Sequence, residues 1–464
     1  MTKFTSFRLS NWRQFHSVEI EFHPRLTVIT GSNGAGKSTI LNVCSQHFGY
    51  ARPIIATPRK TKGGGIAYDS GYFRSPYSQE TNSAFFEDED AEDDEVDAED
   101  EDQFDFFVPF TPDKQSNVPL HSYSPTSFVE IGSIGYDNGT VGTIGFPEQQ
   151  AQAYGLQINN QQPVAGVPIA SHRTISAFQP VQGLSLHGAN LTQAYHAYFS
   201  EHVNRLNGGH TQFSPFYRMK ETLITMAAFG GEGNPHLERN KELSVAFEGF
   251  GKILKKILPK ELGFQKLLVR VPDIVLKTRS GEFIIDASSG GVAAIIEIAW
   301  QIYLFSLTSD SFVVTLDEPE NHLHPSMQRS ILANLIDAFP QTQFIVATHS
   351  PFIVSAVEDS RVYVLKYMGA VGQSGFPTRR PRRVRSIALD QADKAGSASE
   401  ILREVLGVRV SIPEWAEKRL ADIVNEFVEA EVNPDTLKSL RTRLSNAGFS
   451  DYYPEAIARL VGNK

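Results

Sequence analysis

The chain has 464 residues, of which 41% are hydrophobic and 21% are charged, a composition typical of soluble globular domains with a sizeable core. It contains no apolar run as long as a membrane span and no charged-then-apolar leader, so we expect no membrane anchor. The single cysteine, Cys44, excludes a disulfide framework and fits a reducing cytoplasm.

The net charge of −10 comes from one short segment. Residues 87–105 hold 14 of the 53 acidic residues and no basic one. Outside that run, 43 basic side chains stand against 39 acidic ones, so the body of the protein is mildly basic. The overall charge therefore does not indicate whether nucleic acid is a partner.

Residues 1–50 predict a small β-layer that leads into a phosphate-binding loop. Val18, Ile20 and Phe22 alternate with polar residues, as in a half-buried strand. An apolar run then precedes residues 31–39, which read GSNGAGKST and match the pattern GxxxxGK[ST]. The flanking strand and helix signals place the positive end of a helix against phosphates.

This loop predicts binding of ATP together with Mg²⁺. Its glycines allow successive backbone N–H groups to point at a triphosphate. Lys37 is expected to reach the β- and γ-phosphates, and the Ser38 hydroxyl is expected to ligate Mg²⁺. The loop residues expected to contact the nucleotide are Asn33, Gly34, Gly36, Lys37, Ser38 and Thr39.

Residues 51–120 interrupt this order and predict a long, largely disordered acidic insertion. A basic, glycine-rich patch at 60–65 precedes the acidic run. That run is either a solvated segment or a strip that occupies a basic groove until nucleic acid displaces it.

A β-rich region is predicted over 121–185 and a helical region over 186–262. The Asn-Gly pair at 138–139, between strand-like runs, is a strong hairpin signal. The helical region has apolar residues at helical spacing. It sustains no heptad repeat, which argues against long coiled-coil arms.

Residues 263–368 contain the second half of the predicted site. An apolar strand at 312–316 ends in Asp317 and Glu318, the pattern of a Walker B element. Asp317 is expected to hold the Mg²⁺ shell, and Glu318 to polarise the attacking water. The next strand ends near His349, whose ring can donate to the γ-phosphate and sense its presence.

Two turns flank the Walker B strand. Residues 286–292 form a Ser-Gly turn at the start of an expected helix, which is a second anion site. Its position just before Walker B distinguishes it from the many ordinary Ser-Gly turns. The turn at 319–325 contains two histidines but no third ligand at zinc spacing, so we interpret it as a turn at a subunit interface.

The composition changes beyond residue 368. A basic linker is predicted over 369–395, where five arginines at 379–385 either bind nucleic-acid phosphates or solubilise a loop. The tail, 396–464, is predicted to be helical. Its amphipathic stripe at Leu420–Val428 either docks a partner, as the surroundings of Trp415 also allow, or packs on the ATPase part of the same chain.

The order of these motifs resembles the ABC-type ATPases of the RecF, SMC and OLD branch. The resemblance rests on residues 9–15, 26–39, 317–325 and 348–350. It implies an α/β fold, with an ATPase head of antiparallel β-layer and α/β core, an inserted helical region and a small helical C-terminal domain. It also implies a homodimer or larger homo-oligomer in which two heads meet and bury two ATP molecules.

The same resemblance assigns further roles. Ser288 and Gly290 become the signature that binds the γ-phosphate of ATP held by Lys37 of a second copy, and His349 becomes the switch histidine.

The sequence departs from the family pattern in two places. Ala287 and Val292 stand where the usual signature has Leu and Gln, which puts tight closure of two heads, or its rate, in question. No glutamine is clearly that of the Q-loop, and Gln149 and Gln150 are candidates only.

Within the branch, Ser171-His172-Arg173 resembles the ATPases of the Septu anti-phage family, which act with a separate HNH endonuclease. OLD proteins instead carry a fused Toprim nuclease, whose Glu and Asp-x-Asp trio the tail lacks. The resemblance therefore implies a Mg²⁺-dependent regulatory ATPase of a defence complex that is not itself a nuclease. The alternative is a DNA repair or recombination ATPase that binds DNA directly.

Overall fold

The computed structural model describes residues 2–61, 65–72, 128–147, 152–173, 178–206, 208–209, 211–232, 236, 238–368, 383–390, 396, 398–405, 414–428 and 433–462. The chain forms two compact units, Met1–Ala395 and Gly396–Lys464. No helix in the described ranges has both the length and the apolar character needed to cross a membrane.

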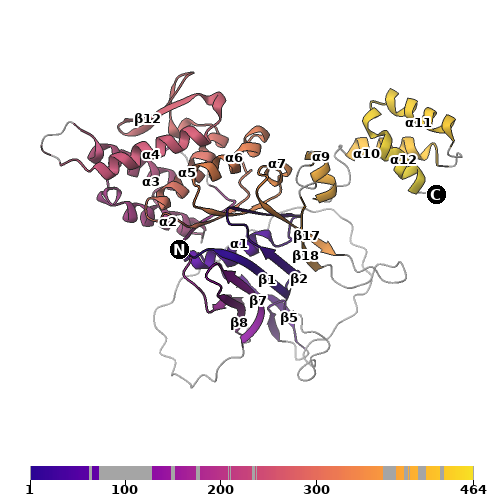
Figure 1. The fold of residues 1–464 in the computed structure, drawn as a ribbon, viewed down its shortest axis with the longest axis horizontal. Coiled ribbons are helices and arrows are strands. Elements are labelled where there is room, and N and C mark those ends of the chain that lie inside the picture. Colours follow the sequence, from indigo (N-terminus) through magenta and orange to yellow (C-terminus); the bar gives the residue numbers. More distant parts are fainter. Residues whose placement is uncertain are drawn as a thin grey trace. The chain divides into compact units, whose positions relative to one another are not determined.

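An 11-stranded sheet forms the centre of the first unit (Figure 1). In spatial order its strands are β10 (Gln157–Asn159), β8 (Val141–Pro147), β7 (Phe128–Tyr136), β1 (Phe4–Trp12), β2 (Phe15–Glu21), β18 (Arg383–Ala388), β17 (Arg361–Met368), β3 (Leu26–Gly31), β16 (Gln343–Thr348), β15 (Val313–Asp317) and β11 (Gly166–Ile169).

The two halves of this sheet differ in strand direction. The strands from β10 to β2 are antiparallel, whereas those from β17 to β11 are parallel. β18 joins the halves, antiparallel to β17 and parallel to β2. This topology confirms the predicted antiparallel β-layer and α/β core.

The burial pattern explains the two halves. β1 and β2 alternate buried and exposed side chains, as strands with one solvated face do. Every residue of β3 and β16 is buried, as expected for parallel strands covered on both faces. The continuous apolar runs in these two segments thus reflect their central position in the sheet.

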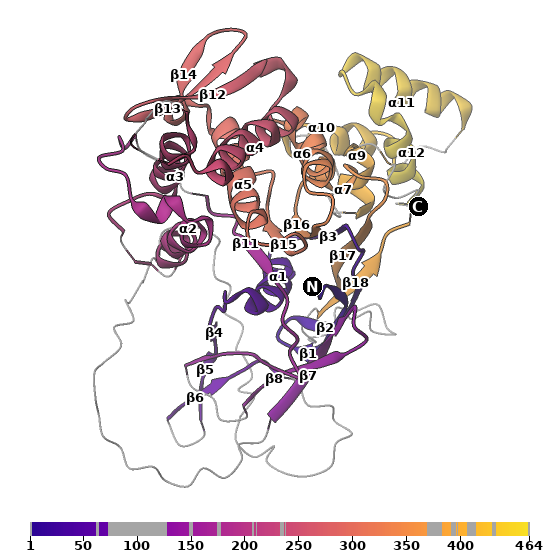
Figure 2. The same cartoon turned by 60° about the vertical axis from the view of Figure 1, so that its left-hand side comes forward.

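Helices cover both faces of the parallel half. In Figures 1 and 2, α1 (Lys37–Ser45) lies on one face, and α5 (Gly290–Ser306) and α6 (Pro325–Ala338) lie on the other. Ile40 and Cys44 of α1 share a hydrophobic core with Phe7 of β1 and Ile345 of β16. The helix that follows the phosphate-binding loop is therefore held between the two halves of the sheet.

The predicted helical region at 186–262 contains three long helices, α2 (Leu191–Leu206), α3 (Pro215–Gly230) and α4 (Lys241–Ile257). α2 and α4 contact α5, and a separate three-stranded sheet contacts α3 and α4. The strands of that small sheet are β12 (Phe264–Arg270), β13 (Asp273–Thr278) and β14 (Glu282–Ile284).

The prediction of disorder over 51–120 is wrong for its first described part. β4 (Ile54–Ile55) pairs with β9 (Ala153–Tyr154), and β5 (Thr57–Lys60) pairs with β6 (Ile66–Asp69). These pairings satisfy backbone hydrogen bonds in a segment with few apolar side chains. The acidic run at 87–105 lies outside the described residues.

The prediction of a linker over 369–395 is wrong for residues 383–388, which form β18 of the main sheet. Val384 is fully buried in the core, and Arg385 of the same strand is exposed. The high arginine content obscured a strand that has a single deeply buried residue. Arg379 and Arg380 lie outside the described residues.

The second unit is helical, with α9 (Ala398–Glu400), α10 (Glu414–Asn425), α11 (Pro434–Asn446) and α12 (Tyr453–Gly462). Leu420, Ile423 and Val424 of α10 are buried against Leu440 and Leu444 of α11. These three residues form the core of their own unit, so the two roles predicted for the stripe, partner docking and packing on the ATPase part, are wrong for them. Phe427 and Val428 are only partly buried against this core.

We expect Leu420→Ala to lower the free energy of unfolding of this small unit by about 2–5 kcal/mol, because it leaves a cavity at a fully buried position. Hydrogen exchange of α11 and α12 amides measures the effect. Trp415→Ala, at a position that is 65% exposed, is the control and should change exchange little. Unchanged protection in Leu420→Ala would contradict the assignment of this core.

Candidate functional site

Three glycines shape the loop that follows β3. Gly31, Gly34 and Gly36 have φ values of 142°, 74° and 97°, which L side chains rarely adopt. A Cβ on Gly31 would lie 2.4 Å from the Leu365 carbonyl oxygen, and one on Gly36 would lie 2.3 Å from the Phe15 ring. The backbone angles therefore favour glycine at all three positions, and at Gly31 and Gly36 there is also no room for a Cβ.

Lys37 begins α1, and its side chain is held against this loop. The residue is 5% exposed, and its Nζ donates to the carbonyl oxygens of Gly31 and Ser32, both at 3.1 Å. Burial lowers the pKa of Lys37 to about 8, although Asp317 acts in the opposite direction. The ammonium group therefore lies on the backbone that is expected to bind phosphate.

Asp317 ends β15 and lies beside Ser38. Burial raises the pKa of the Asp317 carboxyl group, and a hydrogen bond from the Ser38 side chain offsets part of that rise. Its Oδ1 atom is buried without a hydrogen-bond partner among the described residues. An unpaired carboxylate oxygen next to a hydroxyl fits Mg²⁺, which prefers oxygen ligands and takes the remainder from water and phosphate.

Glu318 follows Asp317 with a φ of 45°, which is uncommon outside glycine. Its N–H donates to the Ala347 carbonyl at 2.8 Å, and its Oε2 accepts a 3.0 Å hydrogen bond from Asn321 Nδ2. Its Oε1 lies 3.7 Å from Nε2 of His349. The structure thus brings the two predicted catalytic side chains together from neighbouring strands.

His349 is partly buried, with a third of its side chain exposed. Burial and the nearby Lys37 lower its pKa below the usual value of 6.5. The ring is therefore neutral at pH 7, so one nitrogen donates and the other accepts a hydrogen bond.

Glu320 is a site residue that the sequence analysis missed. Its Oε1 accepts hydrogen bonds from Thr348 Oγ1 at 2.8 Å, His349 N at 2.7 Å and Ser350 N at 3.1 Å. One oxygen thus fixes the backbone that presents His349. The sequence contained one signal for this role, because Glu320 is an acidic residue two positions after Glu318. It lies in the turn at 319–325, which we interpreted only as part of a subunit interface.

The predicted signature turn lies at the N-terminus of α5. The Ser288 hydroxyl is buried without a hydrogen-bond partner among the described residues. Asp286 accepts a 2.8 Å bond from Lys220 of α3, whose side chain is fully buried. In the described part of the chain, Ser288 and Gly290 share no hydrogen bond or ion pair with the Lys37 loop. Gln149 and Gln150 lie outside that part.

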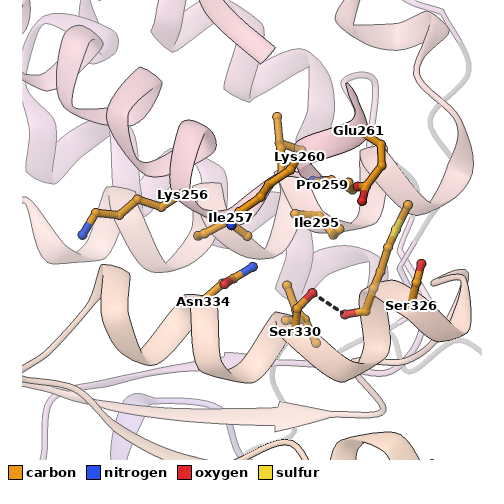
Figure 3. Close-up of a pocket in the computed structure, with 12 residues that line it drawn as sticks. Lys256, Ile257, Pro259, Lys260, Glu261, Ile295, Ser326, Ser330 and Asn334 are labelled. Carbon is orange, nitrogen blue, oxygen red and sulfur yellow. Dashed lines mark hydrogen bonds between the residues drawn. The ribbon is translucent and has the colours of Figure 1, made fainter. Parts of the chain in front are cut away.

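Three pockets lie near these elements, and among them only one contains residues predicted to hold nucleotide or Mg²⁺. Ser38 and Asp317 line a cavity of about 330 Å³ together with His172 and Arg52. Figure 3 shows another pocket, of about 350 Å³, between α4, α5 and α6, with Ser330 among its lining residues. No residue predicted to contact nucleotide lines that second pocket, so the cavity beside Ser38 and Asp317 is the candidate for the predicted nucleotide site.

Two family models match the parts of the chain that hold these motifs. One, "AAA domain", matches residues 6–101. The other, "AAA domain, putative AbiEii toxin, Type IV TA system", matches residues 246–355. Together they span both the phosphate-binding loop and the Walker B strand.

Curated relatives match at low identity and over part of their length. "Retron Ec83 probable ATPase" of Escherichia coli is 26% identical over 219 residues, which are 46% of this chain and 32% of that protein. "Septu protein PtuA" of Bacillus mycoides (strain KBAB4) is 28% identical over 131 residues, 28% of this chain and 15% of that protein. The chain thus spans about a third or less of the length of the curated relatives it matches.

Among solved structures, the SMC head domain from Thermotoga maritima is 13% identical, with a TM-score of 0.38 over 84% of this chain and 99% of that one. Because this score is low, the fold assignment rests on strand order and motifs. Strand order, motif order and the two AAA-domain matches support the predicted resemblance to the ABC-type ATPases of the RecF, SMC and OLD branch. The retron match extends over more of the chain than the Septu match.

We expect Lys37→Ala to weaken ATP binding at least about 100-fold, because the phosphates lose a buried charge-assisted partner. Isothermal titration calorimetry measures the affinity. Lys256→Ala, which removes an exposed ammonium on α4 paired with Asp337, is the matched control and should bind ATP normally. Retained affinity in Lys37→Ala would refute the loop assignment.

Proposed function

We propose that the protein binds and hydrolyses ATP with Mg²⁺. The observation that carries this proposal is the convergence of five predicted groups at one sheet edge. The charge of Asp317 acts on Lys37, Ser38 and Asp317 line the same cavity, and Glu318 lies beside His349. Phosphoryl transfer needs positioning and charge neutralisation rather than covalent chemistry, and these groups supply both.

Each group has a role in this reaction. Mg²⁺, held by Ser38 and Asp317, would neutralise charge on the β- and γ-phosphates. Lys37 would bind the phosphates once its ammonium leaves the loop carbonyls. Glu318 would orient the attacking water and accept its proton. His349, neutral at pH 7, would donate a hydrogen bond to the γ-phosphate.

We propose further that two copies complete each site. The Ser288 hydroxyl lacks a partner in the described part of the chain, and Gly290 begins a 17-residue helix whose N-terminus attracts anions. A second copy would present this turn to the γ-phosphate bound by Lys37. The turn at 319–325 would then lie at the interface between the two copies.

For the biological role, we propose a regulatory ATPase of a bacterial anti-phage complex that controls a separate HNH-type endonuclease. Relatives named for a retron and for Septu support this proposal. We propose that the nuclease binds the surface around Trp415 of α10. This side chain is 65% accessible, and tryptophans often anchor protein interfaces.

Glu318→Gln should preserve ATP binding and lower kcat about 100-fold or more, because the amide cannot accept the proton from water. ATP should then trap the closed dimer, which light scattering after size-exclusion chromatography detects. Glu242→Gln, an exposed position on α4, serves as the control. Normal turnover in Glu318→Gln would move the base elsewhere.

Trp415→Ala should weaken co-purification with an HNH endonuclease encoded beside this gene by about 10-fold or more, the effect expected of an aromatic anchor. Val245→Ala, which removes another exposed apolar side chain at 70% accessibility, should leave co-purification intact. Equal binding by Trp415→Ala, or the lack of such a neighbouring gene, would count against the proposed partner.

A further inference from the structure

We propose that Arg173 and Asn321 are positioning residues for hydrolysis: Arg173 fixes the backbone of the turn at 317–321, and Asn321 fixes the Glu318 carboxylate. This inference rests on the proposed ATP hydrolysis and adds two residues to it. In the sequence, Arg173 is part of the Ser-His-Arg resemblance and Asn321 is part of the predicted interface turn at 319–325.

Strand pairing brings Arg173 to the site. β11 pairs in parallel with β15, with Ile169 opposite Leu316. Parallel neighbours end at the same edge of a sheet, so the residues after β11 lie next to those after β15. Arg173, four residues beyond Ile169, thus reaches the turn that contains Glu318, although 145 residues separate the two in sequence.

The guanidinium group of Arg173 is directed at main-chain carbonyls. Its NH2 donates to the Glu318 carbonyl oxygen at 2.8 Å. Longer contacts reach the carbonyl oxygens of Asn321 and Asp317, both at 3.5 Å, and of Ala170 at 3.4 Å. The residue is only 8% exposed. A planar group with several donors can hold such a set of carbonyls, which an ammonium cannot do equally well.

The shortest of these bonds acts on the residue with the least favourable backbone. Glu318 has a positive φ of 45°, a backbone conformation that is unfavourable for a non-glycine residue unless its surroundings fix it. Arg173 binds the carbonyl of this residue, and β16 binds its N–H. We infer that these two bonds hold the catalytic glutamate in its observed conformation.

Asn321 completes the arrangement through its side chain. Its Nδ2 donates to Glu318 Oε2 at 3.0 Å and to the Ser171 carbonyl oxygen at 3.3 Å. One carboxylate oxygen is therefore engaged, and the other stays on the side of His349, 3.7 Å from its Nε2. Asn321 thereby sets which oxygen of Glu318 is available to water.

Glu297 of α5 provides the countercharge for Arg173. Glu297 is 6% exposed, and its charge is the one that most favours the charged form of Arg173. Burial raises the pKa of Glu297 to about 7, and the charge of Arg173 acts against that rise. A neutral substitution of Arg173 would remove this opposing charge and risk unfolding. Arg173→Lys keeps the charge and removes the fork of donors, so it is the informative variant.

The test uses Arg173→Lys and Asn321→Leu in the full chain, with Mg-ATP. Neither residue hydrogen-bonds the loop at 31–39, so we expect the Kd for ATP to stay within about 3-fold while kcat falls about 10- to 100-fold. Arg25→Lys is the matched control. Arg25 likewise has a buried, unpartnered Nε and donates NH2 to a main-chain carbonyl, that of Ile336 at 2.9 Å, and its substitution should leave kcat unchanged.

The possible outcomes distinguish a failure of this inference from a failure of the proposed ATP hydrolysis. A folded Arg173→Lys with wild-type kcat would overturn the role of Arg173, and a parallel loss of ATP affinity and kcat would show a merely structural role. The same two criteria apply to Asn321→Leu. A wild-type protein that binds ATP without turnover would instead refute the proposed hydrolysis, and the inference with it, before any variant is compared.

Discussion

The parallel pairing of β3, β16, β15 and β11 is the constraint on which the site depends. It aligns the carboxyl ends of four strands at one edge of the sheet. Each strand then leads into a different part of the candidate site at that edge: the predicted phosphate-binding loop, His349, the pair Asp317 and Glu318, and the Arg173 segment. Because these strands are largely buried, a register shift of any one of them would disrupt its packing and displace the residues that follow it.

The second requirement at this edge is a balance of buried charge. Asp317, Glu318 and Glu320 follow one strand, and three carboxylates so close together would repel one another in a medium of low dielectric constant. The positive charge of Lys37 interacts favourably with all three carboxylates. One oxygen of Glu320 also accepts hydrogen bonds from backbone N–H groups after β16. Asp317 and Glu320 each retain a buried oxygen without a hydrogen-bond partner among the described residues, and the one on Asp317 belongs to the carboxylate that shares a cavity with Ser38.

The sequence predicted those parts of the site whose chemistry is local. The glycine pattern of residues 31–39 and the acids after an apolar strand each lie within a few residues, so spacing alone indicates their role. Arg173 acts on Glu318 across 145 residues, and no spacing rule connects them. The strand at 383–388 was missed for a similar reason, since its pairing with β2 and β17 gives an arginine-rich segment one fully buried side chain, Val384.

Two buried cations outside the expected nucleotide contacts share one physical task. Arg173 fixes the turn after β15 through carbonyl oxygens, and Lys220 fixes the turn before α5 through Asp286. Both turns are thus held by side chains from other elements, which is how a preorganised site is supported. The Ser288 hydroxyl, two residues after Asp286, has no hydrogen-bond partner among the described residues. If two heads close on nucleotide as we propose, this turn is already fixed within its own chain.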